Sequence, residues 1–263
     1  MKKHILDLTV RQAQRVHERY VLLRLTDEHQ PLPPMLPGQF AEVRVDGSPS
    51  TFLRRPISIC NVDTAQNELW LLVAIVGEGT RCMASLQPGD CLNCVLPLGN
   101  GFTLPPHPSP LNSYLLVGGG VGVAPLLYLG AQLRQSGTEP TFLLGARRES
   151  DLLLTDEFRR YGRVYVTTED GSAGEQGFVT QHSVLDKEHF SHIYTCGPTP
   201  MMKAVARLAR EKGITCEASL ENMMACGLGA CLCCVEKTKR GNLCVCKDGP
   251  VFNTDELLWQ SYK

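Results

Sequence analysis

Six cysteines lie close together near the C-terminal end of the sequence, and four of them have the spacing of an iron–sulfur ligand set. Cys226, Cys231 and Cys234 form the pattern C-x4-C-x2-C, and Cys246 follows after eleven intervening residues. This is the plant-type spacing, in which four thiolates hold a [2Fe–2S] cluster. Such a cluster takes up one electron at a time, so the pattern predicts a metal centre used for electron transfer.

The extra cysteines and the type of metal leave alternatives open. A structural zinc site usually has two C-x2-C pairs, whereas four residues separate the first pair here. Cys233 and Cys244 also lie beside the ligand positions. Cys233 breaks the x2 spacing and Cys244 competes only with Cys246, so we interpret both as small hydrophobic side chains that bind no metal.

Glycines that follow two strand-like runs are typical of a dinucleotide site. GGGVGVAPL (118–126) follows YLLV, and CGPTPMM (196–202) opens a predicted helix. Glycines in this setting let phosphates approach a helix N-terminus, although glycine after a strand also marks simple turns. In an open parallel sheet both loops face one crevice. The candidate nucleotide contacts are Gly118, Gly119, Gly120, Gly122, Gly197 and Pro198.

Three further residues bear on how a nicotinamide nucleotide would bind. Glu169 and Asp170 follow the third strand of the predicted sheet and suit ribose hydroxyls. The segment VTTEDGS (166–172) contains no arginine for a 2′-phosphate, which favours NAD over NADP. Cys196 is a candidate for contact with the nicotinamide ring, and a buried thiol at a strand end is the alternative.

Two short segments suit a flavin. In FLRRPISI (52–59), Arg55 can meet a pyrophosphate bidentately and Ser58 can hydrogen-bond a ring nitrogen, so one strand would fix both ends of FAD. The alternative is that Arg55 is only a surface charge, since Arg-x-x-Ser is a common pattern. Gly79 and Thr80 suit a phosphate held by backbone N–H groups and a hydroxyl.

These candidates must be positioned by two kinds of fold. Short strand-like runs at 20–25, 40–45, 69–76 and 91–96, separated by Gly, Pro and Asp, predict an antiparallel barrel. Beyond the Pro- and Gly-rich segment 97–112, the pattern changes. Strand-like runs at 114–119, 141–146, 162–168 and 191–197 then alternate with helical stretches, the last at 198–213, which predicts a parallel α/β domain.

The predicted fold class is therefore α/β plus all-β, in three parts. We expect an antiparallel β-barrel FAD-binding domain at residues 1–108 and a parallel α/β NAD-binding domain at 109–213. A small [2Fe–2S] lobe at 214–263, too short for a large core, would be held together by its metal.

Composition narrows the classes of partner and compartment. With 263 residues, a net charge of -1, 43% hydrophobic and 20% charged residues, nothing indicates nucleic acid or an anionic membrane surface. The opening MKKHILDLTV lacks the apolar run of a signal peptide, and no stretch approaches the roughly 20 apolar residues of a membrane span. Twelve cysteines are too few for a disulfide scaffold of this size. A cytoplasmic protein is expected.

Taken in order, these motifs resemble one family, the electron-transfer subunits of dihydroorotate dehydrogenase B, in the ferredoxin–NADP reductase superfamily. The resemblance covers nearly the whole chain and rests on RRPISI, GEGT, LLVGGGVGVAPL, EDGSAGEQGFVT, TCGPTPMM, LENMMACGLGACLCC and VCKDGPVF. It implies that the match at VCKDGPVF selects Cys246 over Cys244 as the fourth ligand. The FAD contacts that it implies are Arg55, Pro56, Ile57 and Ser58, then Leu72, Val73 and Ala74, then Gly79 and Thr80.

The resemblance also implies an activity and a partner. The family oxidises dihydroorotate to orotate on an FMN-bearing catalytic subunit, for de novo pyrimidine (UMP) biosynthesis, and passes electrons through the cluster and FAD to NAD+. FAD would collect two single electrons and deliver them as a hydride. A heterotetramer of two subunits of each kind is implied. No segment of this chain is left for the organic substrate, so we expect a catalytic partner docked at the cluster lobe.

Two rival functions remain at this point. One is a flavin and iron–sulfur reductase subunit that exchanges electrons between ferredoxin and NAD(P)H on the same domains. The other is a non-enzymatic, zinc-bound interaction module on a degenerate reductase fold.

Overall fold

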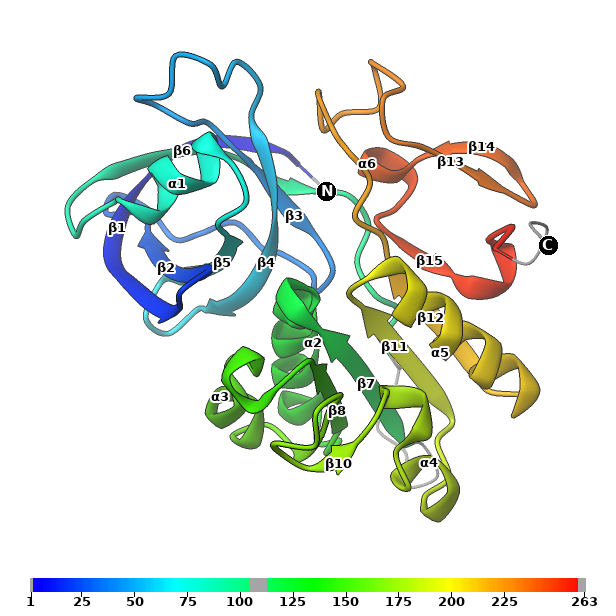
Figure 1. Ribbon diagram of the computed structural model, residues 1–263. Helices are drawn as coiled ribbons and strands as arrows, with labels where there is room; N and C mark the ends of the chain where they lie inside the picture. Colours follow the sequence, from blue (N-terminus) through cyan, green and yellow to red (C-terminus); the bar gives the residue numbers. More distant parts are fainter. Residues whose placement is uncertain (1, 105–112, 260–263) are drawn as a thin grey trace.

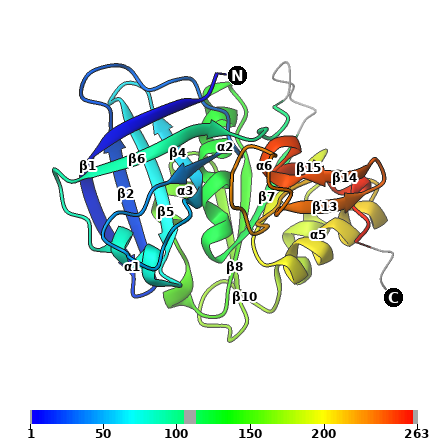
Figure 2. The same ribbon diagram turned by 90° about the horizontal axis from the view of Figure 1, so that it is seen from above.

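The computed structural model describes residues 2–104 and 113–259. In Figure 1 a barrel, a parallel sheet with helices, and a small C-terminal lobe lie against one another. Seen from above in Figure 2, the barrel and the C-terminal lobe stand on opposite sides of the molecule. No helix among the described residues is long and apolar enough to cross a membrane.

The first part is a closed barrel in the strand order β1-β2-β5-β4-β3-β6. Every neighbouring pair of its strands is antiparallel, and a short helix, α1 (Glu78–Ala84), connects β5 to β6. Alternate residues point inward, and Leu8, Leu23, Ile59 and Leu71 are fully buried in its core. The strands are β1 (His4–His17), β2 (Tyr20–Thr26), β3 (Phe40–Val43), β4 (Arg55–Asp63), β5 (Glu68–Ala74) and β6 (Cys91–Leu98).

The second part is a seven-stranded sheet in the order β10-β9-β8-β7-β11-β12-β15. All neighbouring strands are parallel except β12 and β15, which are antiparallel. The strands are β7 (Tyr114–Gly119), β8 (Thr141–Ala146), β9 (Arg163–Thr168), β10 (Glu175–Gln176), β11 (His192–Cys196), β12 (Thr215–Ser219) and β15 (Val251–Asn253).

Helices cover both faces of this sheet. On one face α2 (Ala124–Gln135) and α3 (Thr155–Arg159) pack over Leu116. On the other face α4 (Val184–Lys187) and α5 (Thr199–Glu211) pack over Leu115. The core beneath α2 includes Leu22 and Leu72 of the barrel, so the barrel and the sheet share a hydrophobic contact.

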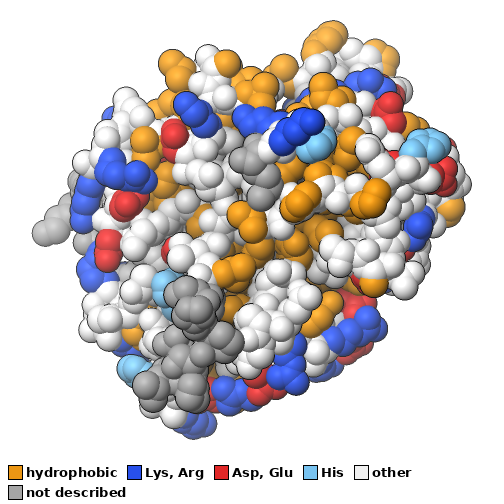
Figure 3. Space-filling model, turned by 180° about the vertical axis from the view of Figure 1, so that it is seen from behind, with side chains coloured by type: hydrophobic (Ala, Val, Ile, Leu, Met, Phe, Trp, Pro, Cys, Tyr) orange, Lys and Arg blue, Asp and Glu red, His pale blue; other side chains and the backbone are white. Residues whose placement is uncertain are grey.

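The third part is the C-terminal lobe, which rests on both of the others. It contains the hairpin β13 (Val235–Thr238) and β14 (Gly241–Cys244), followed by α6 (Val245–Asp248). Its core joins Cys234, Cys246 and Phe252 to Phe40 and Leu98 of the barrel. Hydrophobic side chains also gather near the centre of the back face (Figure 3).

The predicted fold class is confirmed, and each of the eight predicted strand runs contains a strand. The long β1 was not predicted, because its second half, from Arg11 onward, carries mostly polar residues. The boundary predicted between residues 108 and 109 lies outside the described residues. The boundary predicted after Gly213 separates β12 from the sheet, yet β12 pairs with β11 and β15 returns to pair with β12. The division into three domains stays a prediction.

Candidate cluster, flavin and nucleotide sites

The cysteines of the predicted ligand set come together in two pairs around one short loop. The Cys231 side chain hydrogen-bonds the Cys226 sulfur, and the Cys246 thiol donates to Cys234. The Cys246 N–H also lies 3.4 Å from the Cys234 Sγ. One sulfur of each pair, that of Cys226 or Cys246, accepts hydrogen bonds from the loop 227–230.

Backbone N–H groups of this loop point at the sulfur atoms. Leu228 and Ala230 donate to the Cys226 Sγ at 3.3 and 3.4 Å, and Gly229 donates to the Cys246 Sγ at 3.1 Å. Gly227 and Gly229 have φ of +65° and +81°, a conformation that favours glycine. Hydrogen bonds to sulfur are a feature of iron–sulfur sites.

The acidity of the Cys226 thiol also fits metal binding. The Leu228 N–H helps hold the pKa of Cys226 down at about 6, which favours its thiolate, the form that binds metal. Burial raises the pKa of Cys246 to about 12. Among residues 2–104 and 113–259, no three His, Cys, Asp or Glu side chains are grouped as a metal site. The two thiol pairs and the donor N–H groups fit a cluster site, in which bound iron would bring the two pairs closer to each other.

The additional cysteines occupy different surroundings. Cys233 is exposed to solvent, whereas Cys244 is buried with its Sγ 4.0 Å from the Gly229 carbonyl oxygen. Cys244 is thus close to the same loop, and Cys233 is not a buried hydrophobic side chain. The choice of Cys226, Cys231, Cys234 and Cys246 as the ligands stays a prediction.

The predicted flavin strand has two distinct faces. Ile57, opposite Ala41 in β3, points into the barrel core, whereas Pro56 and Ser58 lie opposite Glu42 and Phe40. Phe40 belongs to the core shared with the C-terminal lobe, so this second face of β3 and β4 points out of the barrel towards that lobe. Ser58 belongs to this outer face, whereas Arg55, opposite Val43 at the start of β4, has the register of the inward-facing Ile57.

Some of the implied flavin contacts are limited to backbone atoms. Val73 points into the barrel core and Leu72 into the core under α2, while Ala74 at the strand end is half-buried. The side chains of Ile57, Leu72 and Val73 are thus occupied by packing. Their backbone groups are what these positions offer a cofactor.

The predicted phosphate loop before α1 uses its hydroxyl for folding. The Thr80 Oγ1 accepts the N–H groups of Val76 and Gly77 at 2.9 and 3.0 Å and donates to the Gly77 carbonyl at 3.0 Å. A Cβ on Gly79 would lie 3.0 Å from the Thr51 Cγ2. The backbone N–H groups at the start of α1, and not the Thr80 hydroxyl, are therefore what suits a phosphate.

The two glycine loops touch each other through their backbones. A Cβ on Gly122 would lie 2.4 Å from both the Cα and the N of Gly197. Gly120 and Gly197 have φ of +56° and +149°. A Cβ on Gly119 would lie 2.9 Å from the Met201 Sδ. The loops at the ends of β7 and β11 therefore pack directly on each other, and the absence of side chains at these glycines is what allows this close approach.

Cys196 ends β11 in the centre of the sheet. It lies opposite Gly118 in β7 and Ser219 in β12, and only 1% of it is exposed. Burial raises its pKa well above the ordinary value, so the thiol stays protonated. It packs in the same core as Leu72 and Val123. This surrounding fits the buried-thiol interpretation, and contact with a nicotinamide ring stays a prediction.

The acidic pair after β9 lies in a recess that also contains arginines. Asp170 accepts hydrogen bonds from the N–H and hydroxyl of Ser172 at 2.9 and 2.6 Å, which lower its pKa. Arg147 and Arg148, which follow the adjacent strand β8, also line the recess, although the sequence signal lay only in the segment after β9. The recess is lined by Glu18, Arg19, Arg147, Arg148, Asp151, Glu169 and Asp170.

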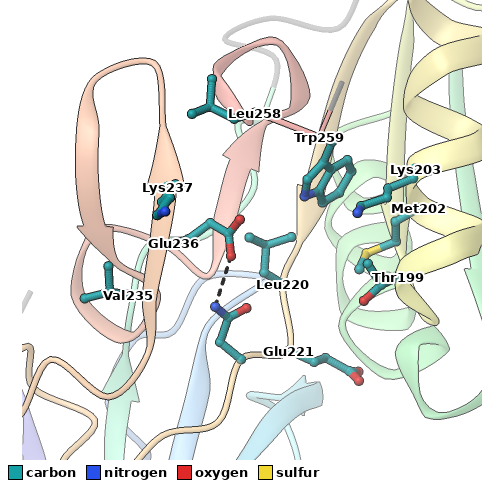
Figure 4. A pocket seen from close by; sticks show the side chains of 11 residues that line it. Thr199, Met202, Lys203, Leu220, Glu221, Val235, Glu236, Lys237, Leu258 and Trp259 are labelled. Atoms are coloured by element: carbon teal, nitrogen blue, oxygen red, sulfur yellow. Dashed lines mark hydrogen bonds between the residues drawn. The ribbon is translucent and has the colours of Figure 1, made fainter. Parts of the chain in front are cut away.

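A second recess lies between α5 and the C-terminal lobe, next to the loop 196–198 (Figure 4). The Asn222 amide donates to the Glu236 carboxylate at 3.1 Å across it. Burial raises the pKa of Glu221. The recess is built from four separate segments, at 199–203, 220–222, 235–237 and 258–259, so no single stretch of sequence indicates it. The lining is Thr199, Met202, Lys203, Leu220, Glu221, Asn222, Val235, Glu236, Lys237, Leu258 and Trp259.

All three candidate sites are neighbours. A Cβ on Gly227 in the cluster loop would lie 2.6 Å from the Glu42 side chain of β3, the strand paired with β4. A Cβ on Gly120 would lie 3.8 Å from the Tyr20 hydroxyl of the barrel. The barrel therefore contacts the cluster loop through β3 and the glycine loops through Tyr20 of β2, an arrangement that suits stepwise electron transfer.

Known proteins resemble this chain in sequence and structure. Residues 221–258 match the iron–sulfur cluster binding domain of dihydroorotate dehydrogenase B, and residues 116–207 match the oxidoreductase NAD-binding domain. A solved structure of an NADH-dependent reduced ferredoxin-NADP oxidoreductase superposes with a TM-score of 0.82 at 29% identity, covering 97% of this chain and 90% of that one.

Two relatives are named dihydroorotate dehydrogenase B (NAD(+)), electron transfer subunit. The protein from Fusobacterium nucleatum is 41% identical, over 84% of this chain and 86% of its own length. The protein from Geobacillus kaustophilus is 37% identical, over 94% of each chain. The chain therefore belongs to the family of electron transfer subunits of NAD(+)-dependent dihydroorotate dehydrogenase B.

Proposed function

We propose that this chain carries electrons from a dihydroorotate-oxidising subunit to NAD+ through a [2Fe–2S] cluster and FAD. One observation supports the proposal most directly. The cluster loop, residues 227–230 and called the thiol loop from here on, packs against the outer face of β3, whose partner strand β4 carries Arg55 and Ser58. When bound, FAD supplies the change from one-electron to two-electron chemistry. The chain supplies the order of the sites.

Each proposed site has a defined task for this chain's residues. Arg55 holds the flavin pyrophosphate and Ser58 hydrogen-bonds the ring, with backbone support from 56–57, 72–74 and 79–80. Gly118, Gly119, Gly120, Gly122, Gly197 and Pro198 admit the phosphates of NAD+. Glu169 and Asp170 hold ribose hydroxyls, and Cys196 closes the floor of the site. Cys226, Cys231, Cys234 and Cys246 hold the cluster.

We further propose a catalytic partner that contains FMN, in an assembly of two subunits of each kind. The name electron transfer subunit, given to the relatives, implies a catalytic partner for them. Three apolar side chains around the thiol loop support docking there: Met223 is 84% exposed, Leu228 47% and Leu232 64%. Exposed apolar side chains that cluster in this way mark protein interfaces.

Cross-linking tests this docking site. Cross-links in the assembled complex should connect the partner to the segment 221–234. Cross-links found only on the barrel would contradict it.

A cytoplasmic location also belongs to the proposal. All twelve cysteines are free thiols, as expected in a reducing compartment. Fractionation of the native host cell with detection of the chain would test this.

The main experiment is an anaerobic absorption spectrum of the purified chain during titration with NADH. We expect about two irons and one FAD per chain. NADH should bleach the visible absorption of both the cluster and the flavin. Zinc in place of iron, or absence of flavin, would contradict the proposal. Reduction by ferredoxin, without co-purification of a dihydroorotate-oxidising subunit, would favour the alternative role between ferredoxin and NAD(P)H.

A further inference from the structure

Glu42 is a buried carboxyl group for which the described chain supplies no hydrogen bond. Only 1% of the residue is exposed, and neither Oε1 nor Oε2 has a hydrogen-bond partner among residues 2–104 and 113–259. A buried polar group without a partner costs on the order of 1–3 kcal/mol, and more when it is charged. Such a group in the middle of a barrel strand indicates a partner that binds there.

The position of Glu42 shows what that partner is. In β3, Ala41 and Val43 point into the barrel core, so Glu42 points outward on the same face as Phe40. A Cβ on Gly227 would lie 2.6 Å from the Cγ and 2.9 Å from the Oε1 of Glu42. The carboxyl group thus packs directly on the thiol loop, beside the residue that follows Cys226.

The neighbouring arginines do not neutralise this carboxyl group by a hydrogen bond. Arg54 uses its Nη1 for the Glu42 and Asn93 carbonyl oxygens at 3.1 and 3.2 Å, and its Nη2 for the Asn93 Oδ1 at 2.5 Å. Arg55 begins the strand proposed to hold the flavin pyrophosphate. Burial raises the pKa of Glu42, and the negative charge of the Cys226 thiolate raises it further.

We propose that Glu42 is a positioning residue of the cluster site, which donates a hydrogen bond from its carboxyl group to the sulfur of Cys226 or to a cluster sulfide beside it. This rests on the proposed function only in requiring a cluster at these cysteines. Hydrogen bonds to sulfur stabilise the reduced cluster, because reduction adds negative charge to the sulfur atoms. The barrel would thereby set the potential of a cluster held by another part of the chain.

The test compares Glu42→Gln with Glu42→Met in the complete chain loaded with iron and flavin. Glutamine keeps a donor of the same shape, and methionine fills the space without one. At a fixed solution potential, we expect Glu42→Met to lower the ratio of reduced to oxidised cluster about tenfold. For a one-electron couple this corresponds to a cluster reduction potential lower by about 59 mV. Glu42→Gln should change that ratio less than about threefold, since it keeps the donor.

Glu217→Gln is the matched control, because this buried glutamate accepts a hydrogen bond from the Thr103 N–H instead. It should leave the cluster potential unchanged. Iron and flavin counts on each variant show whether both cofactors are loaded. If Glu42→Met does not load a cluster, proton hyperfine spectroscopy of the reduced wild-type cluster decides. An exchangeable proton coupled to the cluster, lost or moved in Glu42→Gln, supports the proposal, and its absence in the wild type overturns it.

Two results with loaded protein would also overturn the proposal. One is an unchanged potential in both variants. The other is a shift to higher potential in both, which would mean that a negative charge, and not a donated hydrogen bond, acts on the cluster. Neither result depends on the partner or on NAD+. A chain that binds no iron at Cys226, Cys231, Cys234 and Cys246 would instead contradict the proposed function itself.

Discussion

The acidity of a single thiol in this chain depends on the backbone and the charges around it. Cys226 is the example, because N–H groups of Leu228 and Ala230 both point at its sulfur. Cys91 is exposed, whereas Cys226 is half-buried, yet the partial burial of the Cys91 thiol and the charge of Asp7 raise the pKa of Cys91. Two accessible thiols of one protein thus differ in acidity for local reasons.

This difference predicts selective alkylation of the iron-free protein. The pKa of Cys226 is about 6 in the folded chain. Since the thiolate is the reactive form, the rate at which Cys226 reacts with iodoacetamide should reach half its maximum near that pH. At neutral pH the rate should be nearly maximal. Mass spectrometry of peptides quenched at several pH values gives the rates. Cys91 is the internal control, and its equal reaction with Cys226 at neutral pH would contradict the prediction.

Arg55 is predicted to hold FAD. Replacing it with alanine removes a charge-assisted hydrogen bond worth roughly 1.5–3 kcal/mol, so FAD should bind about ten- to a hundredfold more weakly. Fluorescence titration of the flavin-free protein measures this. Arg15→Ala on exposed β1 is the matched control and should bind FAD normally. Equal FAD affinity in both variants would contradict the role given to Arg55.

Elements bring together residues that the sequence keeps far apart. The glycine loops were predictable, because glycine after a strand and before a helix has a physical meaning that one sequence shows. Arg147 and Arg148 were not predictable, because only the pairing of β8 with β9 brings them into the recess that contains Glu169 and Asp170. The role of Thr80 in its own turn was likewise hidden, since a hydroxyl can serve the backbone or a ligand equally well.

The contact between the glycine loops predicts the effect of one methyl group. Gly122→Ala would place a Cβ against the backbone of Gly197, which cannot move as a flexible side chain can. Overpacking of this kind costs about 1–3 kcal/mol and should weaken NADH binding by at least tenfold while FAD is retained. Calorimetric titration with NADH measures the affinity.

Gly137→Ala is the control for that substitution. Unlike Gly122, Gly137 has a positive φ, of +89°, and its Cβ would meet nothing within 4 Å. The unfolding temperature of this variant should fall while NADH affinity stays unchanged. Equal NADH affinity in the two variants would show that the loop contact does not shape the nucleotide site.

At the scale of the whole molecule, the C-terminal lobe has no core of its own. Cys234 and Cys246 are buried with Phe40 and Leu98 of the barrel and Phe252 of the sheet. The spacing of the cysteines indicated a ligand set, which stays a prediction. A single sequence does not show that β12 and β15 pair with each other across the segment that contains these cysteines.

Removal of the iron should therefore loosen the lobe and its supports together. Binding that favours only the folded state adds to stability, so the cluster-free chain should unfold at lower temperature. Limited proteolysis should cut first between residues 221 and 250, and the barrel should remain protected while FAD is bound. Identical cleavage with and without iron would contradict this. Reloading iron and sulfide should restore the original pattern.

The return of β15 to the edge of the sheet has a mechanical consequence. Because β12 leads into the lobe and β15 leads out of it, and the two strands are hydrogen-bonded to each other, the lobe is anchored at two adjacent points. A body held in this way has no single hinge about which it can swing. The gap between cluster and flavin is then fixed by covalent and sheet geometry, and the internal electron transfer rate should not change with solvent viscosity.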